Sequence, residues 1–292
     1  MLYPNQMQNE YLTYGEIIRK STAFLLNKGV STAKCDSEWI VSHLVKTSRI
    51  ELYLNFDDLV PQEKISEIRN RIVQRGRRIP LQHILESVQF CDLRLKCDRR
   101  ALIPRPETER LVEIIIDSVG KAFNGKILDL GSGTGAIVLA LCKQLKEAKG
   151  LGVDKSSEAI SLSRENLCLL NLSGRVSFQK FDWMQEEYKQ EKFDLLISNP
   201  PYLSLEEWKT AEPEVCKHDP KDALVSAEGG LAHLRKLLDL SKSALKKDCQ
   251  IFLEVGMGQA EIVMEMMKDV FYDIEVRKDF CGIRRYVFAR IY

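Results

Sequence analysis

The segment FDLLISNPPYL ends in four residues whose chemistry is unusual for a loop: Asn199, Pro200, Pro201 and Tyr202. Two consecutive prolines cannot continue a strand, and Pro200 restricts Asn199 to extended conformations, so we expect a rigid loop after a buried strand. The Asn199 side-chain oxygen and the Pro200 carbonyl can each accept one N–H of an –NH2 group, while Tyr202 can pack against its plane. These catalytic and substrate-binding candidates suit a reaction at a planar amide or amine nitrogen, for which positioning is decisive.

A second candidate site is the glycine-rich loop inside ILDLGSGTGAIVLAL. An apolar strand precedes the loop and an apolar helix follows it. Glycines permit positive φ and let a ligand approach the backbone, and the helix N-terminus offers free N–H groups. Open α/β sheets bind ligands at this edge, so we expect cofactor contacts here rather than a simple chain reversal. The candidate residues are Gly131, Ser132, Gly133, Thr134 and Gly135.

Acidic residues end the two strands that follow. Asp154 closes GLGVD and is placed to accept hydrogen bonds from both hydroxyls of a ribose. Asp182 and Trp183 follow SFQKF, where the carboxylate could take an adenine amine and the indole could stack on the ring; a buried core tryptophan is the alternative. Nicotinamide cofactors use the same glycine spacing and acidic residue. Asp129 and the DLGxGxG pattern resemble motif I of class I methyltransferases, which favours S-adenosylmethionine.

The elements that must position these residues alternate between strand and helix from about residue 104. Such alternation predicts a mostly parallel sheet with helices on both faces, that is, a doubly wound α/β domain. The last segment follows its predecessor after a short link, so we expect it to be antiparallel. The strand candidates are KILDL, GLGVD, RVSFQ, FDLLIS, QIFLEV, FYDIEV and RRYVFARIY.

The chain upstream of this domain has a different pattern. Residues 1–85 show helical spacing of apolar residues, with a capping box at Thr13 and Glu16, and predict a small helical domain. Residues 86–103 alternate apolar and polar side chains and predict a β-hairpin linker to the domain of residues 104–292. The arginine-rich run at 69–78 is interpreted as a solvated helix face, with an acidic or nucleic-acid partner as the alternative.

Composition limits the class of protein. The 43 basic and 42 acidic residues give a net charge of +1, which argues against a protein whose main task is to hold nucleic acid. We find no apolar run of membrane-spanning length and no secretory signal. The eight cysteines form no C-x-x-C pair and the four histidines show no metal spacing. We therefore expect a reduced, cytoplasmic protein without a metal, a membrane or a stable nucleic-acid partner. Composition does not indicate an oligomeric state, and a monomer is the default expectation.

The motif IPRPETE at 103–109, joined to the glycine loop and Asn-Pro-Pro-Tyr, resembles the HemK/PrmC family of protein-(glutamine-N5) methyltransferases over essentially the whole chain. The resemblance implies a class I methyltransferase fold, Rossmann-like with a mostly parallel seven-stranded sheet. It also implies that the helical domain that precedes this fold in the chain binds the substrate. It implies methylation of the Gly-Gly-Gln glutamine of class I peptide-chain release factors, with Asn199 also near the cofactor and Phe90 against the substrate. The family's usual glycines near Glu86 and Asp92 are missing from this chain, so its hairpin turns depart from the family pattern.

Other functions share part of this pattern. An adenine-N6 methyltransferase would place adenine's amine between Asn199 and Pro200, but we find no region with interleaved basic and aromatic residues to bind a flipped base. A nicotinamide-dependent oxidoreductase would use the glycine loop and Asp154 but leaves Asn-Pro-Pro-Tyr unexplained. A binding module that has lost activity is disfavoured, because both motifs are intact.

Overall fold

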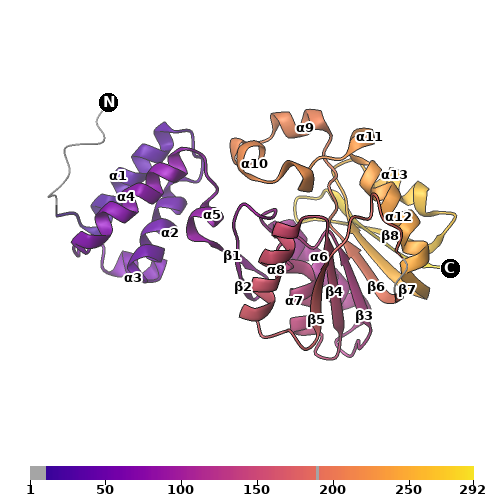
Figure 1. Ribbon diagram of the computed structural model, residues 1–292. Helices are drawn as coiled ribbons and strands as arrows, with labels where there is room; N and C mark the ends of the chain where they lie inside the picture. The colour runs from indigo at the N-terminus through magenta and orange to yellow at the C-terminus, as the bar shows by residue number, and fades with distance from the viewer. Residues whose placement is uncertain (1–10, 189–190) are drawn as a thin grey trace. The chain divides into compact units, whose positions relative to one another are not determined.

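The computed structural model describes residues 11–188 and 191–292, and it divides into two compact units, Met1–Glu86 and Ser87–Tyr292 (Figure 1). Residues 1–10 of the expected N-terminal domain lie outside the described part. Each unit is described by itself below.

The first unit is helical. The capping box expected at its start is present, because Thr13 accepts a hydrogen bond from the backbone of Glu16 and the Glu16 carboxylate accepts one from Thr13. A second capping box, at Ser48 and Glu51, begins a short helix that the apolar pattern did not indicate. The helices are α1 (Tyr14–Asn27), α2 (Ala33–Val45), α3 (Arg49–Leu54), α4 (Gln62–Gly76) and α5 (Leu81–Leu85).

The arginine-rich run is partly structural, which corrects its interpretation as a solvated face. The Arg75 Nε donates to Asp36 Oδ2 at 2.6 Å, and both side chains are buried between α4 and α2. Arg78 donates to the Gly29 carbonyl at 2.9 Å and so joins the end of α4 to the end of α1. Arg75 is therefore part of the core of this unit. Removing either partner of the ion pair would leave an uncompensated buried charge.

The second unit begins with the expected hairpin, formed by β1 (Ser87–Phe90) and β2 (Leu93–Lys96) in antiparallel register. Its turn is Cys91–Asp92, and Cys91 adopts a positive φ of 49° where a glycine would be unstrained. Asn166, on α8 (Ser157–Leu169), accepts from the Lys96 N–H at 2.7 Å and donates to the Lys96 carbonyl at 3.1 Å. These bonds fix the hairpin to α8 within the second unit.

The seven-stranded, mostly parallel sheet predicted from the sequence is confirmed, with the order β5-β4-β3-β6-β7-β9-β8. Only β9 runs against its neighbours β7 and β8, as its short link suggested. The strands are β3 (Lys126–Leu130), β4 (Lys149–Asp154), β5 (Val176–Lys180), β6 (Phe193–Ser198), β7 (Leu245–Glu254), β8 (Phe271–Lys278) and β9 (Arg284–Ile291).

Helices cover both faces of this sheet (Figure 1). One core cluster packs strand residues against α6 (Pro106–Val119), α7 (Ala136–Gln144) and α8. The other packs them against α12 (Ala232–Ala244) and α13 (Ala260–Met267). The buried strands therefore read as continuous apolar runs, and their carboxyl ends carry the polar residues.

Between β6 and α12 the chain makes a long excursion, here called the 203–231 segment. It contains α9 (Leu205–Thr210), α10 (Pro213–His218), a 3-10 turn (Lys221–Ala223) and α11 (Ala227–Gly230). Its two ends are joined by backbone hydrogen bonds between Leu203 and Leu224 and between Ser226 and Leu203, both 2.9 Å. The excursion is therefore a closed loop that leaves and re-enters the domain at one place.

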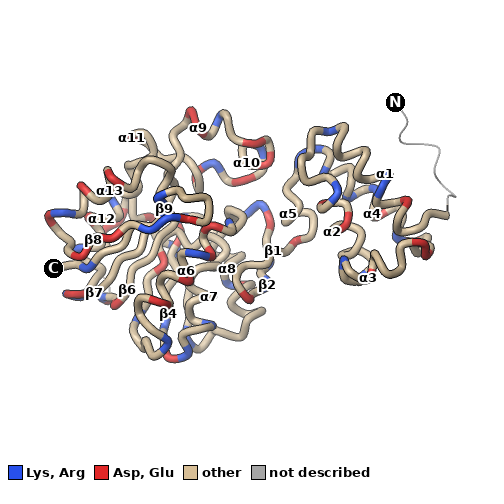
Figure 2. The backbone as a smooth tube through the Cα atoms, turned by 180° about the vertical axis from the view of Figure 1, so that it is seen from behind, with Lys and Arg blue, Asp and Glu red and all other residues tan. Residues whose placement is uncertain are grey.

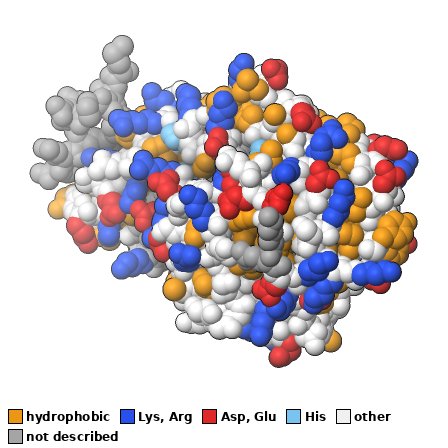
Figure 3. Space-filling model, turned by 45° about the vertical axis from the view of Figure 1, so that its right-hand side comes forward, with side chains coloured by type: hydrophobic (Ala, Val, Ile, Leu, Met, Phe, Trp, Pro, Cys, Tyr) orange, Lys and Arg blue, Asp and Glu red, His pale blue; other side chains and the backbone are white. Residues whose placement is uncertain are grey.

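Over the residues that the structure describes, charge is distributed without large blocks of one sign. Acidic and basic residues are interspersed along both units (Figure 2), and the same mixture covers the face shown in Figure 3. Among the described helices, none has the length and apolar character that a membrane span requires. Across residues 11–188 and 191–292, no group of three or more His, Cys, Asp or Glu side chains has metal-binding geometry.

Candidate active site

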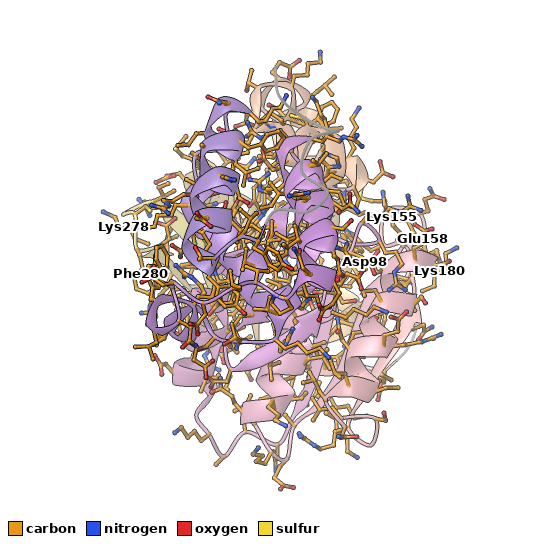
Figure 4. The ribbon with its side chains drawn as sticks, turned by 90° about the vertical axis from the view of Figure 1, so that its left-hand side faces the viewer. Asp98, Lys155, Glu158, Lys180, Lys278 and Phe280 are labelled. Atoms are coloured by element: carbon orange, nitrogen blue, oxygen red, sulfur yellow. The ribbon has the colours of Figure 1, made fainter. Side chains whose placement is uncertain are left out.

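The candidate residues gather at the carboxyl ends of the parallel strands. The glycine loop joins β3 to α7, Asp154 ends β4, and Asn199 to Tyr202 follow β6. Figure 4 shows Lys155, Glu158 and Lys180 on one side of this unit and Lys278 and Phe280 on the other. The site lies between these two groups because β3, β6 and β7 are the inner strands of the sheet order.

The glycine loop is held by the neighbouring strand. The N–H groups of Gly131 and Ser132 both donate to the Val153 carbonyl, at 2.8 and 3.0 Å. Gly133 donates to the Asp154 Oδ2 at 3.0 Å. All three glycines of the loop have positive φ, which is 78° at Gly131. The loop therefore curls over the end of β4 in a conformation that other residues rarely adopt.

Asp154 is fixed by two backbone donors. Its Oδ2 accepts from Gly133 and its Oδ1 accepts from Ser156 at 2.9 Å. Burial raises the pKa of the Asp154 carboxyl, and these two hydrogen bonds oppose the shift. Each carboxylate oxygen keeps a lone pair, so the group can still accept two hydroxyl protons in the manner expected for a ribose.

Trp183 forms a wall beside the glycine loop. The residue is 5% exposed, and a Cβ added at Gly131 would lie 3.1 Å from its ring. The indole also packs edge-on against His233 of α12, with 6.0 Å between ring centroids. The neighbouring Asp182 is half-buried and accepts the Met184 N–H at 3.0 Å. Trp183 belongs to a core cluster, and its stacking on an adenine stays a prediction.

Several buried polar atoms on this side have no hydrogen-bond partner among the described residues. They are Asp129 Oδ1, Ser132 Oγ and Trp183 Nε1. Asp129 is fully buried, and burial raises its pKa to about 7. Buried polar groups are normally satisfied, so these are the atoms for which a polar ligand would supply the missing partners. The residues present are thus compatible with a nucleoside cofactor such as S-adenosylmethionine.

The Asn-Pro-Pro-Tyr loop is anchored at both ends. Ser198, its predecessor, donates to the Leu130 carbonyl at 2.6 Å. At the other end, Gln259 donates to the Tyr202 carbonyl at 2.9 Å. Gly230 lies so close that an added Cβ would be 2.1 Å from the same carbonyl, so only glycine fits there. The expected rigidity therefore comes from packing as well as from the two prolines.

Two residues that sequence reasoning missed complete this side of the site. Asn199 Nδ2 donates to Thr108 Oγ1 at 3.1 Å, and Thr108 donates to Glu254 Oε2 at 2.8 Å. The Tyr202 hydroxyl lies 3.4 Å from Glu254 Oε1. The available signals were the acidic residue at the end of the QIFLEV strand and the threonine inside IPRPETE.

Glu254 is an unusual carboxyl group. Its residue is 1% exposed, and burial raises its pKa to about 7. The hydrogen bond from Thr108 and the charge of Arg285 favour the ionised form and oppose this shift, whereas Glu107 adds to it. Glu254 therefore changes its charge near neutral pH, inside a network that contacts Asn199 and Tyr202.

The IPRPETE motif joins the 203–231 segment to the site. Arg105 forms an ion pair with Asp219 at 2.6 Å, and the Asp219 side chain is 1% exposed. At the other end of the site, Lys155 contacts Asp222 of the same segment at 3.2 Å. The Glu107 carbonyl accepts the Tyr286 hydroxyl at 2.7 Å. Arg105 therefore links the start of α6 to the 203–231 segment.

Phe90 is the one candidate that the structure does not bring to these residues. It ends β1 with no exposed surface and packs in the core cluster that includes Leu93, Leu95 and residues of α6 and α7. A side chain that is fully buried in a core has no surface to offer a substrate. Its assignment to the substrate pocket therefore stays a prediction without support from this geometry.

Known proteins resemble both units. Residues 16–85 match the family model of the PrmC N-terminal domain, and residues 108–221 match that of the methyltransferase small domain. A release factor glutamine methyltransferase of Geobacter sulfurreducens is 33% identical over 97% of this chain and 98% of its own length. Another, of Deinococcus radiodurans, is 33% identical over 94% of this chain and 97% of its own.

The chain belongs to the family of release factor glutamine methyltransferases. It is therefore an enzyme that transfers methyl groups, which favours the expected class over a nicotinamide-dependent oxidoreductase.

Solved structures show the same fold at low identity. A methyltransferase of Pyrococcus furiosus has a TM-score of 0.51 with 16% identity, covering 78% of this chain and 98% of its own. The hMettl16 catalytic domain in complex with the MAT2A 3'UTR hairpin 6 has a TM-score of 0.56 with 15% identity, covering 68% and 75%. These likenesses concern the fold alone.

Proposed function

We propose that this enzyme transfers a methyl group from S-adenosylmethionine to the side-chain amide nitrogen of the glutamine in the Gly-Gly-Gln motif of class I release factors. The family membership supports this substrate, because the relatives at 33% identity are named for it. Release factors act in translation termination, so we also propose that the enzyme works in the cytoplasm. We expect it to act as a monomer.

The observation that carries the proposal is the orientation of Asn199. Its Nδ2 is engaged by Thr108 at 3.1 Å, so its Oδ1 is the atom left to accept a hydrogen bond from a substrate. The Pro200 carbonyl follows in a loop fixed at Ser198 and Tyr202. Two acceptors at this place suit an –NH2 group, which carries two protons.

The reaction requires that the amide nitrogen be positioned against the methyl group. An amide nitrogen is a poor nucleophile because its lone pair is delocalised into the carbonyl group. S-adenosylmethionine, when bound, supplies an electrophilic methyl group on a sulfonium. Asn199 and Pro200 would hold the amide N–H groups so that the nitrogen faces that methyl group, and Tyr202 would pack on the amide plane. Fixing the reacting atoms in this way can lower the barrier by roughly 7–11 kcal/mol.

The cofactor would be held on the other side of the site. We assign its ribose to Asp154, its adenine to Asp182 and Trp183, and its amino-acid part to the loop of Gly131, Ser132, Gly133, Thr134 and Gly135. The partnerless Ser132 Oγ and Trp183 Nε1 support this assignment, because a polar ligand would supply their hydrogen bonds. Asn199 would lie where the two sides meet.

Mass spectrometry tests the proposal directly. The purified enzyme is incubated with S-adenosylmethionine and a release factor, and the digested factor is analysed for a methyl group on the Gly-Gly-Gln glutamine. A release factor with glutamate at that position is the control. A gain of one methyl group on the glutamine alone supports the proposal. No gain there, together with methylated adenine in supplied DNA or RNA, would replace it with an adenine-N6 methyltransferase.

A further inference from the structure

The hydroxyl group of Thr108 lies between two side chains that come from the ends of the neighbouring strands β6 and β7. It contacts Asn199 Nδ2 at 3.1 Å and Glu254 Oε2 at 2.8 Å. Ser198 and Leu253 are paired in the parallel register of β6 and β7, so the residues that follow them, Asn199 and Glu254, lie side by side. Thr108, 4% exposed on α6, closes the gap between them.

The direction of these hydrogen bonds follows from the chemistry of the three groups. An ionised carboxylate only accepts, so the single hydroxyl proton of Thr108 must point to Glu254. The Thr108 oxygen can then only accept a proton from its other neighbour. Asn199 must therefore turn its NH2 group towards Thr108 and its Oδ1 away from it. The carboxylate decides which end of the Asn199 amide faces the substrate.

We propose that Thr108 and Glu254 are positioning residues that set the orientation of the Asn199 amide, and thereby the selectivity of the site for –NH2 over carboxylate. This inference rests on the proposed function, in which Asn199 accepts an N–H of the glutamine. With Oδ1 and the Pro200 carbonyl both accepting, a glutamine amide is bound and a glutamate carboxylate, which has no proton to give, is repelled. A reversed Asn199 would present a donor and lose this distinction.

The orientation depends on the charge of Glu254. Its charged and titratable neighbours are Glu107 on α6, Tyr202 in the loop, and Arg285 and Tyr286 on β9. Arg285 also forms an ion pair with Asp279 at 2.9 Å, so its charge acts on two carboxyl groups. The pKa of Glu254 is raised to about 7, chiefly by burial. Once protonated, Glu254 can donate to Thr108, whose own proton then turns to Asn199 Oδ1 and pulls that oxygen away from the substrate.

Substitution of Thr108 tests the hydroxyl group. Thr108→Val keeps the shape and removes the hydrogen bonds, and we expect kcat on the release factor to fall roughly tenfold or more, as for a lost buried hydrogen bond. The dissociation constant for S-adenosylmethionine stays near that of the wild type, and Thr108→Ser recovers most of the rate. Thr47→Val is the matched control, since it removes an exposed threonine–glutamate hydrogen bond in the first unit.

Substitution of Glu254 tests the charge. In the wild type, we expect kcat to fall as the pH drops through about 7. Glu254→Gln cannot change its charge, so its kcat should lose this acid limb. In the same assays, Gly-Gly-Gln and Gly-Gly-Glu peptides compete with the release factor for the site. The ratio of their inhibition constants measures the selectivity for the amide over the carboxylate, and Thr108→Val should lower this ratio roughly tenfold.

Nuclear magnetic resonance separates a failure of this inference from a failure of the proposed function. The Asn199 side-chain NH2 signals, identified by their loss in Asn199→Asp, report the hydrogen bond without any substrate. They should shift with pH in the wild type and stay constant in Glu254→Gln. If they do so while no glutamine is methylated, the orientation stands and the substrate is wrong. The inference would be overturned if Thr108→Val kept the wild-type kcat and selectivity. It would also be overturned if the Asn199 NH2 signals had the same pH dependence in the wild type and in Glu254→Gln.

Discussion

The two sides of the active site differ in how far the chain itself satisfies their polar groups. On the acceptor side, Asn199, Thr108 and Glu254 are linked to one another, and Tyr202 is held through its carbonyl. On the cofactor side, Ser132 Oγ and other buried atoms have no partner among the described residues. On the acceptor side the side chains orient one another before any ligand binds, whereas on the cofactor side buried polar atoms are left for a ligand to satisfy.

This difference suggests a division of labour. The acceptor nitrogen is weak and must be oriented, so the groups that orient it have to be fixed in advance. The cofactor carries its own reactive group and needs only to be bound. Substitutions on the acceptor side should therefore lower kcat, whereas those on the cofactor side should weaken cofactor binding and spare kcat at saturation.

The largest effect is expected for Asn199→Ala. Removal of one preorganised hydrogen-bonding group in an active site typically costs roughly 10²–10³-fold in kcat. The affinity for S-adenosylmethionine, measured by calorimetry, and the melting temperature should change little. Asn70→Ala, at an exposed position of α4, is the control. Retained turnover in Asn199→Ala would remove the basis for the acceptor side as described.

Asp154→Asn is the corresponding change on the cofactor side. The carboxylate accepts from Gly133 and Ser156 and keeps room for a ribose, and an amide can accept at only one of its two ends. Loss of hydrogen bonds to a charged group should raise the dissociation constant for S-adenosylmethionine about tenfold to hundredfold. At saturating cofactor, kcat should approach the wild-type value.

Calorimetry and steady-state kinetics together check this prediction. Asp117→Asn, at an exposed position on α6, should leave both quantities unchanged. A variant that binds the cofactor normally but turns over slowly would show that Asp154 acts on the acceptor side, and the division between the two sides would be lost.

The sequence predicted the contiguous motifs of the site but not the contacts between distant residues. The glycine loop and Asn-Pro-Pro-Tyr were recognisable because each is a short, contiguous segment whose residue types imply a backbone shape. The bond between Thr108 and Glu254 joins residues 146 positions apart, and it depends on the register of β7 and the packing of α6. No local pattern encodes such a contact. The sheet was predictable because buried parallel strands leave continuous apolar runs.

The short elements were harder for a different reason. The helices of the 203–231 segment have only four to six residues, too few for an apolar period to be visible. Phe90 was assigned by resemblance alone, and because its side chain is buried in a core cluster, its role at the substrate stays a prediction. Arg75 shows the limit of charge patterns, since its partner Asp36 lies on another helix.

The pH dependence of stability probes the acceptor side without substrate. The pKa of Glu254 is raised to about 7 in the folded protein, above the ordinary value of 4.5, so the folded state binds this proton more tightly than the unfolded state. The contribution of Glu254 to stability is therefore present below about pH 4.5 and is lost as the pH rises towards 7.

Glu254→Gln removes this dependence. Its free energy of unfolding, relative to the wild type, should rise by on the order of 1 kcal/mol between pH 5 and pH 8. Urea denaturation at both pH values measures it. Because Asp129 also has a raised pKa, only the difference between variant and wild type isolates Glu254. Glu206→Gln, at an exposed position of α9, should show no such rise, and a constant difference for Glu254→Gln would contradict the expected burial effect.

The smallest effect is expected for Trp183→Phe, which tests whether the indole serves the core or the cofactor. Phenylalanine keeps an aromatic ring beside Gly131 but is smaller and lacks the Nε1 group that has no partner in the described chain. If the ring stacks on adenine, affinity for S-adenosylmethionine should fall a few-fold, in line with the roughly 0.5–1.5 kcal/mol of an aromatic contact.

The core role predicts a different result for the same variant. A tryptophan that only fills space would lower the melting temperature on truncation and leave the dissociation constant unchanged at temperatures where the protein stays folded. Trp39→Phe, on the 44% exposed tryptophan of α2, shows how much of either change is general to the substitution. Because Trp183 touches both the glycine loop and His233, a loss of affinity without a loss of stability would assign its ring to the cofactor side.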